Sequence, residues 1–215
     1  MPKAKPTTRS DRLRQGSADR REAGRVRLRD ELVTVAERLL QENGYAGFSL
    51  RQVAEETGYT PTTVYRHFRD RDDLLQTVLN TWFAKFAAVL DAADREATNP
   101  HGRLIAQGQA YLRFAVQHPA VYRVMFLERM DIGVLPTGES FREDPAFGVL
   151  IRAVQALHDA GLTGRHDVMS AAMMIWTGIH GVAAMAVCSN MLDDIGAERL
   201  GRLASENTLA GLRHG

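Results

Sequence analysis

Two short helical segments separated by a glycine constrain the fold of this chain more than any other feature of its sequence. The first is expected over residues 49–57, because it opens on a serine, a good N-cap, and is followed by Gly58 as a helix stop. The second is expected over residues 61–68, because it opens on a proline, favoured in the first turn, after Thr60 as its cap. Two short helices joined in this way predict a helix-turn-helix.

The small and apolar residues of these segments support the same interpretation. The crossing needs a small residue on the first helix, a turn residue that tolerates positive φ, and an apolar residue on the second helix. Ala54, Gly58 and Val64 stand at those positions. The residues expected to complete a small core are Phe48, Leu50, Val53 and Phe68. Taken alone, this spacing is a modest signal, since many helical hairpins contain it.

Apolar residues elsewhere recur three and four positions apart, which is the spacing of one helix face. They predict one helix from about residue 28 to Asn43 and a long helix that starts after its cap, Asp70. The further helices are expected near 104–115, 121–127, 145–160, 164–189 and 196–212, with a loop at 131–143. No stretch of convincing length alternates with a period of two, so the expected fold class is all-α, with about nine helices.

The distribution of charge separates the two ends of the chain. Residues 1–30 hold ten Arg and Lys against four Asp and Glu, a net charge of +6, whereas residues 71–215 carry a net charge of −3. We therefore expect a basic flexible arm over 1–22, a helix-turn-helix domain over 23–70 and a larger helical domain over 71–215. A basic arm suits a polyanion, and a solvated disordered tail is the alternative.

Cysteine content and residue spacing argue against several functions. Cys188 is the only cysteine, so no disulfide framework or cysteine metal cluster can form, and we expect it to be a small core residue. No nucleophile, base and acid stand at an interpretable spacing. We therefore expect no enzyme activity, no cofactor and no metal.

Residues 168–188 are apolar enough and long enough to span a bilayer. We favour a helix buried on several sides in a soluble protein, because the run contains Ser170, Thr177 and His180. The charged amino end lacks the apolar core of a signal peptide. The protein is therefore expected in the cytoplasm, without a membrane partner.

The string GYAGFSLRQVAEETGYTPTTVYRHFRDRDDLL resembles the DNA-binding domain of the TetR family nearly end to end. The match spans Gly44 to Leu75 and, with the preceding helix, covers about residues 26–75. The segments GYAGFSLRQVA and TVYRHF are its most characteristic parts. The resemblance implies a three-helix DNA-binding domain followed by an all-helical domain that dimerises and holds an effector.

The resemblance also makes the second short helix the recognition helix, which enters the major groove of DNA by its amino end. Pro61, Thr62 and Thr63 would then face base edges or sugars, and Tyr65 and His67 would contact phosphates. The alternative for Tyr65 and His67 is packing on the core of the hairpin. The full set of expected DNA contacts is Ser49, Arg51, Thr60, Pro61, Thr62, Thr63, Tyr65, Arg66, His67 and Arg71.

Three arginines in this set have different expected roles. Arg51 matches a position that often reads a base in the family, and a guanidinium can bond guanine bidentately. Arg66 could reach either phosphate or guanine, and solvated surface positions are the alternative for Arg51 and Arg66. Arg71 stands where most relatives carry Lys at the start of the long helix, so it keeps the charge for a phosphate contact.

In the carboxy-terminal part, Trp176, His180 and Gly181 form a WxxxHG pattern that resembles the signature of one TetR subgroup, whose carboxy-terminal domain is called WHG. Trp176 and His180 are four residues apart and therefore share a helix face. Two interpretations stay open. Both residues could line the effector pocket, with His180 forming a hydrogen bond, or His180 could be a satisfied core histidine beside a packing tryptophan.

Met and aromatic residues on the flanking helices are further candidates for an apolar pocket, although such residues are more often ordinary core. The expected ligand contacts are Trp82, Phe86, Tyr111, Phe114, Tyr122, Met125, Phe126, Phe147, Met173, Trp176 and His180, with Phe83 and Met174 as further candidates. No charged residue clearly lies among them, so the expected effector is neutral or lipophilic.

The sequence therefore predicts a ligand-responsive repressor that releases a palindromic operator when a small, largely apolar effector binds. We expect a homodimer through about 164–189 and 196–212. One alternative is an all-helical enzyme, which would need a catalytic set. The other is a non-specific or architectural DNA-binding protein without an effector, which would bind through its basic arm and surface alone.

Overall fold

The computed structural model of the protein describes residues 9–128, 144–189 and 192–214. Its helices are α1 (Arg9–Asn43), α2 (Leu50–Thr57), α3 (Pro61–Tyr65), α4 (Arg71–Glu96), α5 (Pro100–Gln117), α6 (Pro119–Phe126), α8 (Pro145–Asp159), α9 (Val168–Cys188) and α10 (Asp194–His214). The described residues form nine helices and no strand, which confirms the all-α prediction. The loop expected at 131–143 lies outside them.

Local capping interactions set the bounds of the two short helices. Ser49 is the N-cap of α2 and Thr60 is the N-cap of α3, as the sequence predicts. Gly58 ends α2 with a φ of 71°, in the left-handed region that glycine adopts without strain. The helix expected over 61–68 is shorter than predicted, because α3 ends at Tyr65 and the chain then turns toward α4.

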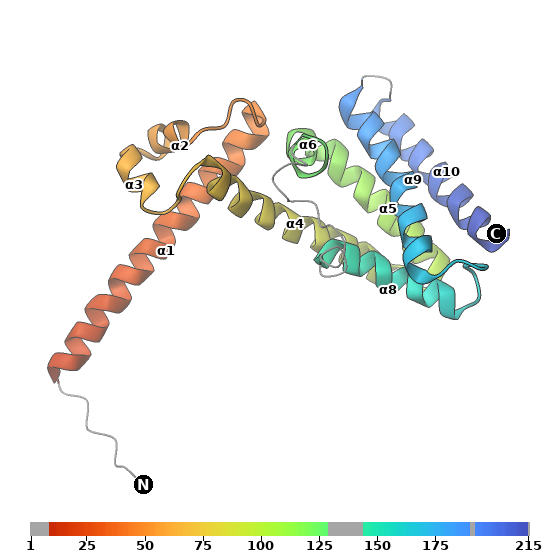
Figure 1. The fold of residues 1–215 in the computed structure, drawn as a ribbon, viewed down its shortest axis with the longest axis horizontal. Coiled ribbons are helices and arrows are strands. Elements are labelled where there is room, and N and C mark those ends of the chain that lie inside the picture. The colour runs from red at the N-terminus through yellow and green to blue at the C-terminus, as the bar shows by residue number, and fades with distance from the viewer. Residues whose placement is uncertain (1–8, 129–143, 190–191, 215) are drawn as a thin grey trace, which may run out of the picture.

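The first helix is longer than the sequence predicts. The expected flexible arm over 1–22 is wrong between Arg9 and Glu22, where the chain forms the first turns of α1. This part projects away from the other helices (Figure 1) and has no packing partner that would select an apolar stripe. It is rich in helix-forming residues, and Arg25 pairs with Glu22 at 2.8 Å one turn away.

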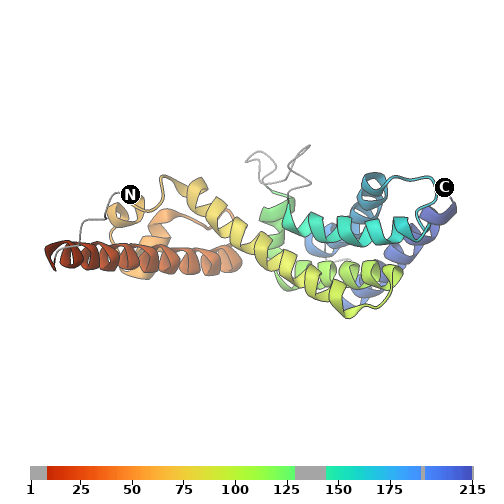
Figure 2. The same cartoon turned by 90° about the horizontal axis from the view of Figure 1, so that it is seen from below.

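Helix α4 connects the amino-terminal helices to the carboxy-terminal bundle (Figures 1 and 2). It packs against α5 and α8, while α10 packs against α9 and α5. Compared with the predicted 164–189, α9 begins later, at Val168, because the carboxylate of Asp167 accepts hydrogen bonds from the first turn. The bundle encloses the largest part of the apolar core.

Two glycines allow α5 and α10 to approach each other closely. A Cβ on Gly108 would lie 2.8 Å from Ser205 Oγ, and a Cβ on Gly201 would lie 2.7 Å from a methyl carbon of Leu112. Real Cβ contacts are longer than these distances. Helix α10 therefore lies directly on the stretch of α5 around Gly108, which becomes important for the cavity described below.

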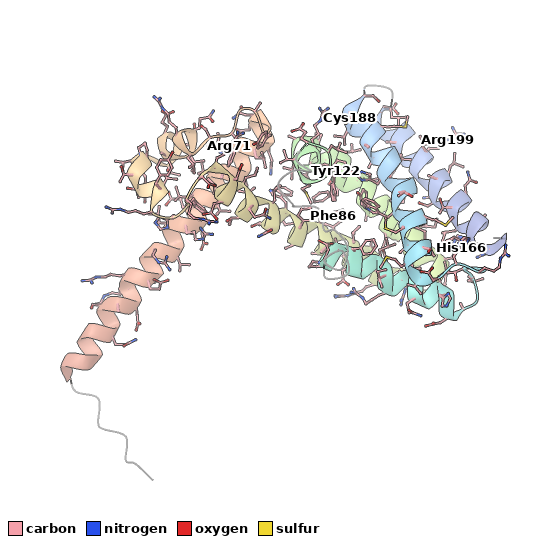
Figure 3. All side chains as sticks on the ribbon, viewed as in Figure 1. Arg71, Phe86, Tyr122, His166, Cys188 and Arg199 are labelled. Atoms are coloured by element: carbon pink, nitrogen blue, oxygen red, sulfur yellow. The ribbon has the colours of Figure 1, made fainter. Side chains whose placement is uncertain are left out.

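Helix α9 is long and apolar enough to cross a membrane by length and composition alone. Its contacts with α5, α8 and α10 are those of a core helix. The expectation for Cys188 is wrong, because its side chain is exposed at the carboxyl end of α9 (Figure 3). Two turns earlier, Gly181 is exposed on the same helix.

Candidate functional site

The helix-turn-helix is held by a small apolar core. Val53, Ala54 and Val64 are fully buried between α2 and α3, and Phe68 is 1% exposed. This confirms the residues that the sequence assigns to the core. Because these side chains occupy the inner face, the remaining side chains of α3 are directed outward.

Arg29 of α1 ties this unit to the start of α4. Its guanidinium donates to the carbonyl oxygen of His67 and to Thr77 Oγ1, each at 3.2 Å, and lies 4.3 Å from the centre of the Phe68 ring. A cation over an aromatic face adds attraction to the hydrogen bonds. One side chain therefore fixes α1, α4 and the turn after α3 relative to one another.

Arg29→Ala is expected to lower the free energy of unfolding by about 2 kcal/mol, because two charge-assisted hydrogen bonds and a cation–π contact are lost. Urea denaturation would measure the change. Arg27→Ala is the matched control, since Arg27 is exposed on the same helix. Equal stabilities of the two variants would contradict the role given to Arg29.

The expected DNA-contacting residues differ in how freely they reach solvent. Tyr65 is 57% exposed, so the alternative in which it packs on the core does not hold. Thr62 and Arg66 are also exposed on the outside of the turn. Arg51 is exposed and pairs with Glu55 at 2.8 Å across one helical turn, a contact that water and salt weaken.

Other members of the set are engaged in the fold. Ser49 Oγ accepts from the N–H of Gln52 and donates to its side-chain oxygen at 2.8 Å. Thr60 Oγ1 accepts from the N–H of Thr63 and lies 3.0 Å from its hydroxyl. These hydroxyls stabilise the amino ends of α2 and α3. Pro61 is exposed at the first position of α3.

Arg71, for which the sequence predicts a phosphate contact, also makes contacts within the protein. Its guanidinium stacks 3.9 Å from the centre of the Tyr45 ring and donates a hydrogen bond to the carbonyl oxygen of Tyr45. The side chain is half-buried, and its guanidinium carbon lies 5.8 Å from the centre of the Phe48 ring. Arg71 therefore fixes the loop between α1 and α2 to the start of α4.

His67 is half-buried, between the exposed end of α3 and α1. Partial burial and the nearby guanidinium groups of Arg25 and Arg29 lower its pKa below the usual value. The same cations create a positive potential on this edge of the domain, which favours an approaching anion.

An apolar cavity lies inside the carboxy-terminal bundle. The cavity is narrow, with a volume of about 60 Å³. The residues that line it are Phe83, Phe86, Leu90, Leu104, Gln107, Gly108, Tyr111, Phe126, Asp144, Ala146, Phe147, Leu150, Ile175, Trp176, Ile179 and Ser205. The cavity is therefore smaller than a typical small-molecule site.

The structure brings about half of the expected ligand contacts to this cavity. Those that line it are Phe83, Phe86, Tyr111, Phe126, Phe147 and Trp176. Those that do not are Trp82, Phe114, Tyr122, Met125, Met173, Met174 and His180. Trp82 and Phe114 lie together on another side of α4 and α5, with ring centres 6.0 Å apart, and Met174 is exposed on α9.

A polar cluster beside the cavity explains the position of His180. Its Nδ1 lies 2.9 Å from the hydroxyl of Tyr111 and 2.8 Å from that of Tyr122, and the two hydroxyls are 3.2 Å apart. The Trp176 ring stacks on the imidazole with centres 4.9 Å apart. The sequence left two interpretations open. His180 fits the second, a histidine whose hydrogen bonds are satisfied within the protein, whereas Trp176 lines the cavity.

Burial lowers the pKa of His180, because a charged imidazolium loses hydration in this cluster. The unfolded chain therefore binds the proton at a higher pH than the folded chain. The stabilisation is complete above about pH 6.5, the ordinary value for histidine, and is lost as the pH falls through the lowered pKa.

We accordingly expect the melting temperature to fall between pH 7.5 and pH 5, and to fall less in His180→Asn, which keeps an acceptor for the tyrosine hydroxyls but does not titrate. Differential scanning calorimetry would measure both series. Burial also lowers the pKa of His118, so His118→Asn is the control that measures how much this second histidine contributes to the pH dependence. A pH dependence that His180→Asn leaves unchanged would contradict the prediction.

Sequence reasoning missed three lining residues with polar side chains, Gln107, Asp144 and Ser205. Gln107 and Ser205 are 4% and 7% exposed, on α5 and α10. The available signal was a polar residue inside an apolar helical pattern, but the sequence does not show which of several such residues face a cavity. Among the described residues, no group of three or more His, Cys, Asp or Glu could hold a metal ion.

Comparison with family models decides the classification. Residues 32–78 match the model described as bacterial regulatory proteins, tetR family, and residues 104–203 match the model described as tetracyclin repressor-like, C-terminal domain. The chain belongs to the TetR family. The first match contains the helix-turn-helix, and the second contains the His180 cluster and most of the cavity wall.

One curated protein and two solved structures are similar to this chain. A curated HTH-type transcriptional regulator of Mycobacterium tuberculosis is 30% identical over 147 residues, which cover 67% of this chain and 60% of that protein. A structure of unknown function from Rhodococcus sp. RHA1 is 30% identical, with a TM-score of 0.74 over 86% of this chain and 95% of that one. A TetR-family regulator from Pectobacterium atrosepticum shares the fold at 23% identity, with a TM-score of 0.72 over 88% and 96%.

Proposed function

We propose that the protein is a DNA-binding transcriptional regulator that acts as a homodimer and releases a palindromic operator when a small molecule binds. The observation that carries the proposal is the outer face of the helix-turn-helix, where Thr62, Tyr65 and Arg66 are exposed on a firmly held turn. A small helix presented in this way fits the major groove of DNA.

The exposed residues divide into two groups by the chemistry that they offer. Thr62 and Pro61 at the amino end of α3 face base edges, and Arg51 reads a base once its ion pair with Glu55 exchanges for guanine. Tyr65 and the positive edge around His67 contact phosphates. Arg71 contributes to DNA binding indirectly, because it holds the loop between α1 and α2 in place.

Tyr65→Phe is expected to weaken binding to operator and non-operator DNA alike, by about tenfold, because one hydrogen bond to phosphate is lost. Fluorescence anisotropy at fixed salt would measure both affinities. Tyr59→Phe is the matched control, since Tyr59 is also exposed but lies in the turn. A loss confined to the operator would instead assign Tyr65 to base reading.

The exposed apolar side chains indicate the dimer surface. Of the eight large hydrophobic side chains that are exposed in the described chain, four lie on α9 and α10: Met174, Met185, Ile195 and Leu203. We place the dimer contact on these two helices, in agreement with the regions 164–189 and 196–212 expected from the sequence. A two-fold dimer presents two recognition helices to a palindrome.

Helix α4 is the proposed connection between cavity and DNA. Phe83, Phe86 and Leu90 line the cavity from one side of α4. On the same helix, Lys85 pairs with Glu37 of α1 at 2.7 Å. A ligand that displaces α4 would therefore move α1 and change the spacing of the two recognition helices, provided that it binds the DNA-free form more tightly.

Selection of bound fragments from a random DNA library, followed by footprinting, tests the proposal. A discrete protected palindrome supports a sequence-specific regulator. Protection without sequence preference would overturn it in favour of the architectural alternative. The salt dependence of binding should be reported with each affinity, since phosphate contacts dominate it.

A further inference from the structure

Two buried polar side chains of the cavity wall, Gln107 and Ser205, each keep a hydrogen-bond acceptor that no contact among the described residues uses. Gln107 and Ser205 are more than nine-tenths buried, and the rest of the wall is mostly apolar. The close approach at Gly108 places Ser205 Oγ against α5, at the residue that follows Gln107 in the chain. The two residues therefore give the mostly apolar wall two polar positions.

The side chain of Gln107 has a fixed orientation. Its Nε2 donates to Asp94 Oδ1 at 2.8 Å, and Asp94 is itself 8% exposed. Because a carboxylate oxygen accepts hydrogen bonds, the amide nitrogen must face Asp94 and the amide oxygen is directed away from it. Gln107 thus offers an acceptor to the cavity.

Ser205 offers an acceptor for a similar reason. Its only hydroxyl proton is donated to the carbonyl oxygen of Gly201 at 3.0 Å, one turn earlier on α10. The lone pairs of its oxygen remain. A bound molecule that left these acceptors with neither water nor a hydrogen-bond donor would incur the desolvation cost of buried polar atoms.

The charges around the cavity disfavour an anion. Among the described residues that line it, none is basic, and Asp144 is acidic. Asp94 lies directly behind Gln107. A carboxylate or phosphate in the cavity would meet negative charge and no basic side chain among the described lining residues.

We infer that the cavity selects a slender, largely apolar molecule carrying a hydroxyl group, an alcohol or a phenol, which donates its proton to Gln107 or Ser205. This inference rests on the proposed function, because it gives the chemical class of the proposed effector. The apolar body of the molecule packs among Phe83, Phe86 and Phe147.

Calorimetric titration of the full chain with three matched probes tests the inference. Phenol carries a donor, anisole only an acceptor in the same place, and benzoate a negative charge. We expect the phenol to bind at least about tenfold more tightly than the other two, because a site built to pair with a hydroxyl rejects analogues that lack it. Equal or tighter binding of the anisole or benzoate, or no binding of the phenol, would overturn the inference.

Variants of Gln107 and Ser205 test whether these residues accept the hydrogen bond from the hydroxyl of the probe. Gln107→Leu and Ser205→Ala should each reduce the preference for the phenol over the anisole, whereas Gln109→Leu should retain it. Gln109 is a suitable control because it is 7% exposed on the same helix but donates to the carbonyl oxygen of Glu198, outside the cavity. If Gln107→Leu fails to fold, the preference measured for Ser205→Ala, which removes a single oxygen, decides the assignment. A full preference in Ser205→Ala and in any folded Gln107→Leu would overturn the assignment.

These titrations contain no DNA, so they separate the inference from the proposed function. A chain that prefers the phenol but protects no operator would leave the inference standing and overturn the regulatory proposal. A chain that protects an operator but shows no preference among the probes would do the reverse.

Discussion

Phe68→Ala is expected to unfold the helix-turn-helix while the carboxy-terminal bundle stays folded. Phe68 is 1% exposed, and its ring also carries the cation of Arg29. Replacement of a buried Phe by Ala costs about 3–5 kcal/mol. A loss of this size is a large share of the total stability of a small domain, and it falls on the core that holds α2 and α3.

The measurement combines two observations on one variant. Operator binding should disappear at micromolar protein, and urea denaturation should show a separate early transition. Phe83→Ala is the control, because the same truncation in the cavity wall enlarges the cavity but leaves the DNA-binding surface intact. Operator affinity within a few-fold of the wild type in Phe68→Ala would contradict the role of this core.

Gly181→Glu is expected to convert the dimer into folded monomers. Gly181 is exposed on α9, and a Cβ there would meet no atom within 4 Å in the protomer, so folding is unaffected. In the proposed dimer the glutamate would be buried without a partner, at a cost of several kcal/mol. Operator affinity should fall by about 100-fold or more, because each half-site then binds alone.

Sedimentation velocity at micromolar protein would measure the change in oligomeric state, and anisotropy would measure the loss of affinity. Val89→Glu is the matched control, since Val89 is 41% exposed on α4, which packs mainly against α5 and α8 rather than on α9 or α10. A Gly181→Glu variant that remains dimeric would place the interface elsewhere.

The helix-turn-helix could be predicted from the sequence because its determinants are local. Ser49 and Thr60 bond to backbone groups three residues away, and Gly58 supplies the left-handed turn within its own position. Such interactions depend on a few neighbouring residues, and a pattern along the chain records them directly. The role of Arg71 could not be predicted, because its stacking partner Tyr45 is 26 residues away.

The cavity was predictable only in outline, for the same physical reason. Trp176 and His180 share one helix face, yet only Trp176 lines the cavity. Tyr111 and Tyr122, which are 69 and 58 residues from His180 along the chain, decide this by binding its imidazole. The sequence does not show that Gln107 lines the cavity, because this depends on how α10 packs against α5.

The length of α1 has a mechanical consequence. A continuous helix of 35 residues is about 50 Å long at 1.5 Å per residue. Lys85 forms an ion pair with Glu37 near the carboxyl end of α1, while the basic residues at the amino end of α1 lie far along the helix axis. A tilt of α1 by about 5° about this ion pair would displace the amino end of the helix by roughly 4 Å, which is more than the length of a hydrogen bond. In the proposed regulator, a small shift inside the bundle would therefore be enough to separate the basic amino end of α1 from a DNA phosphate.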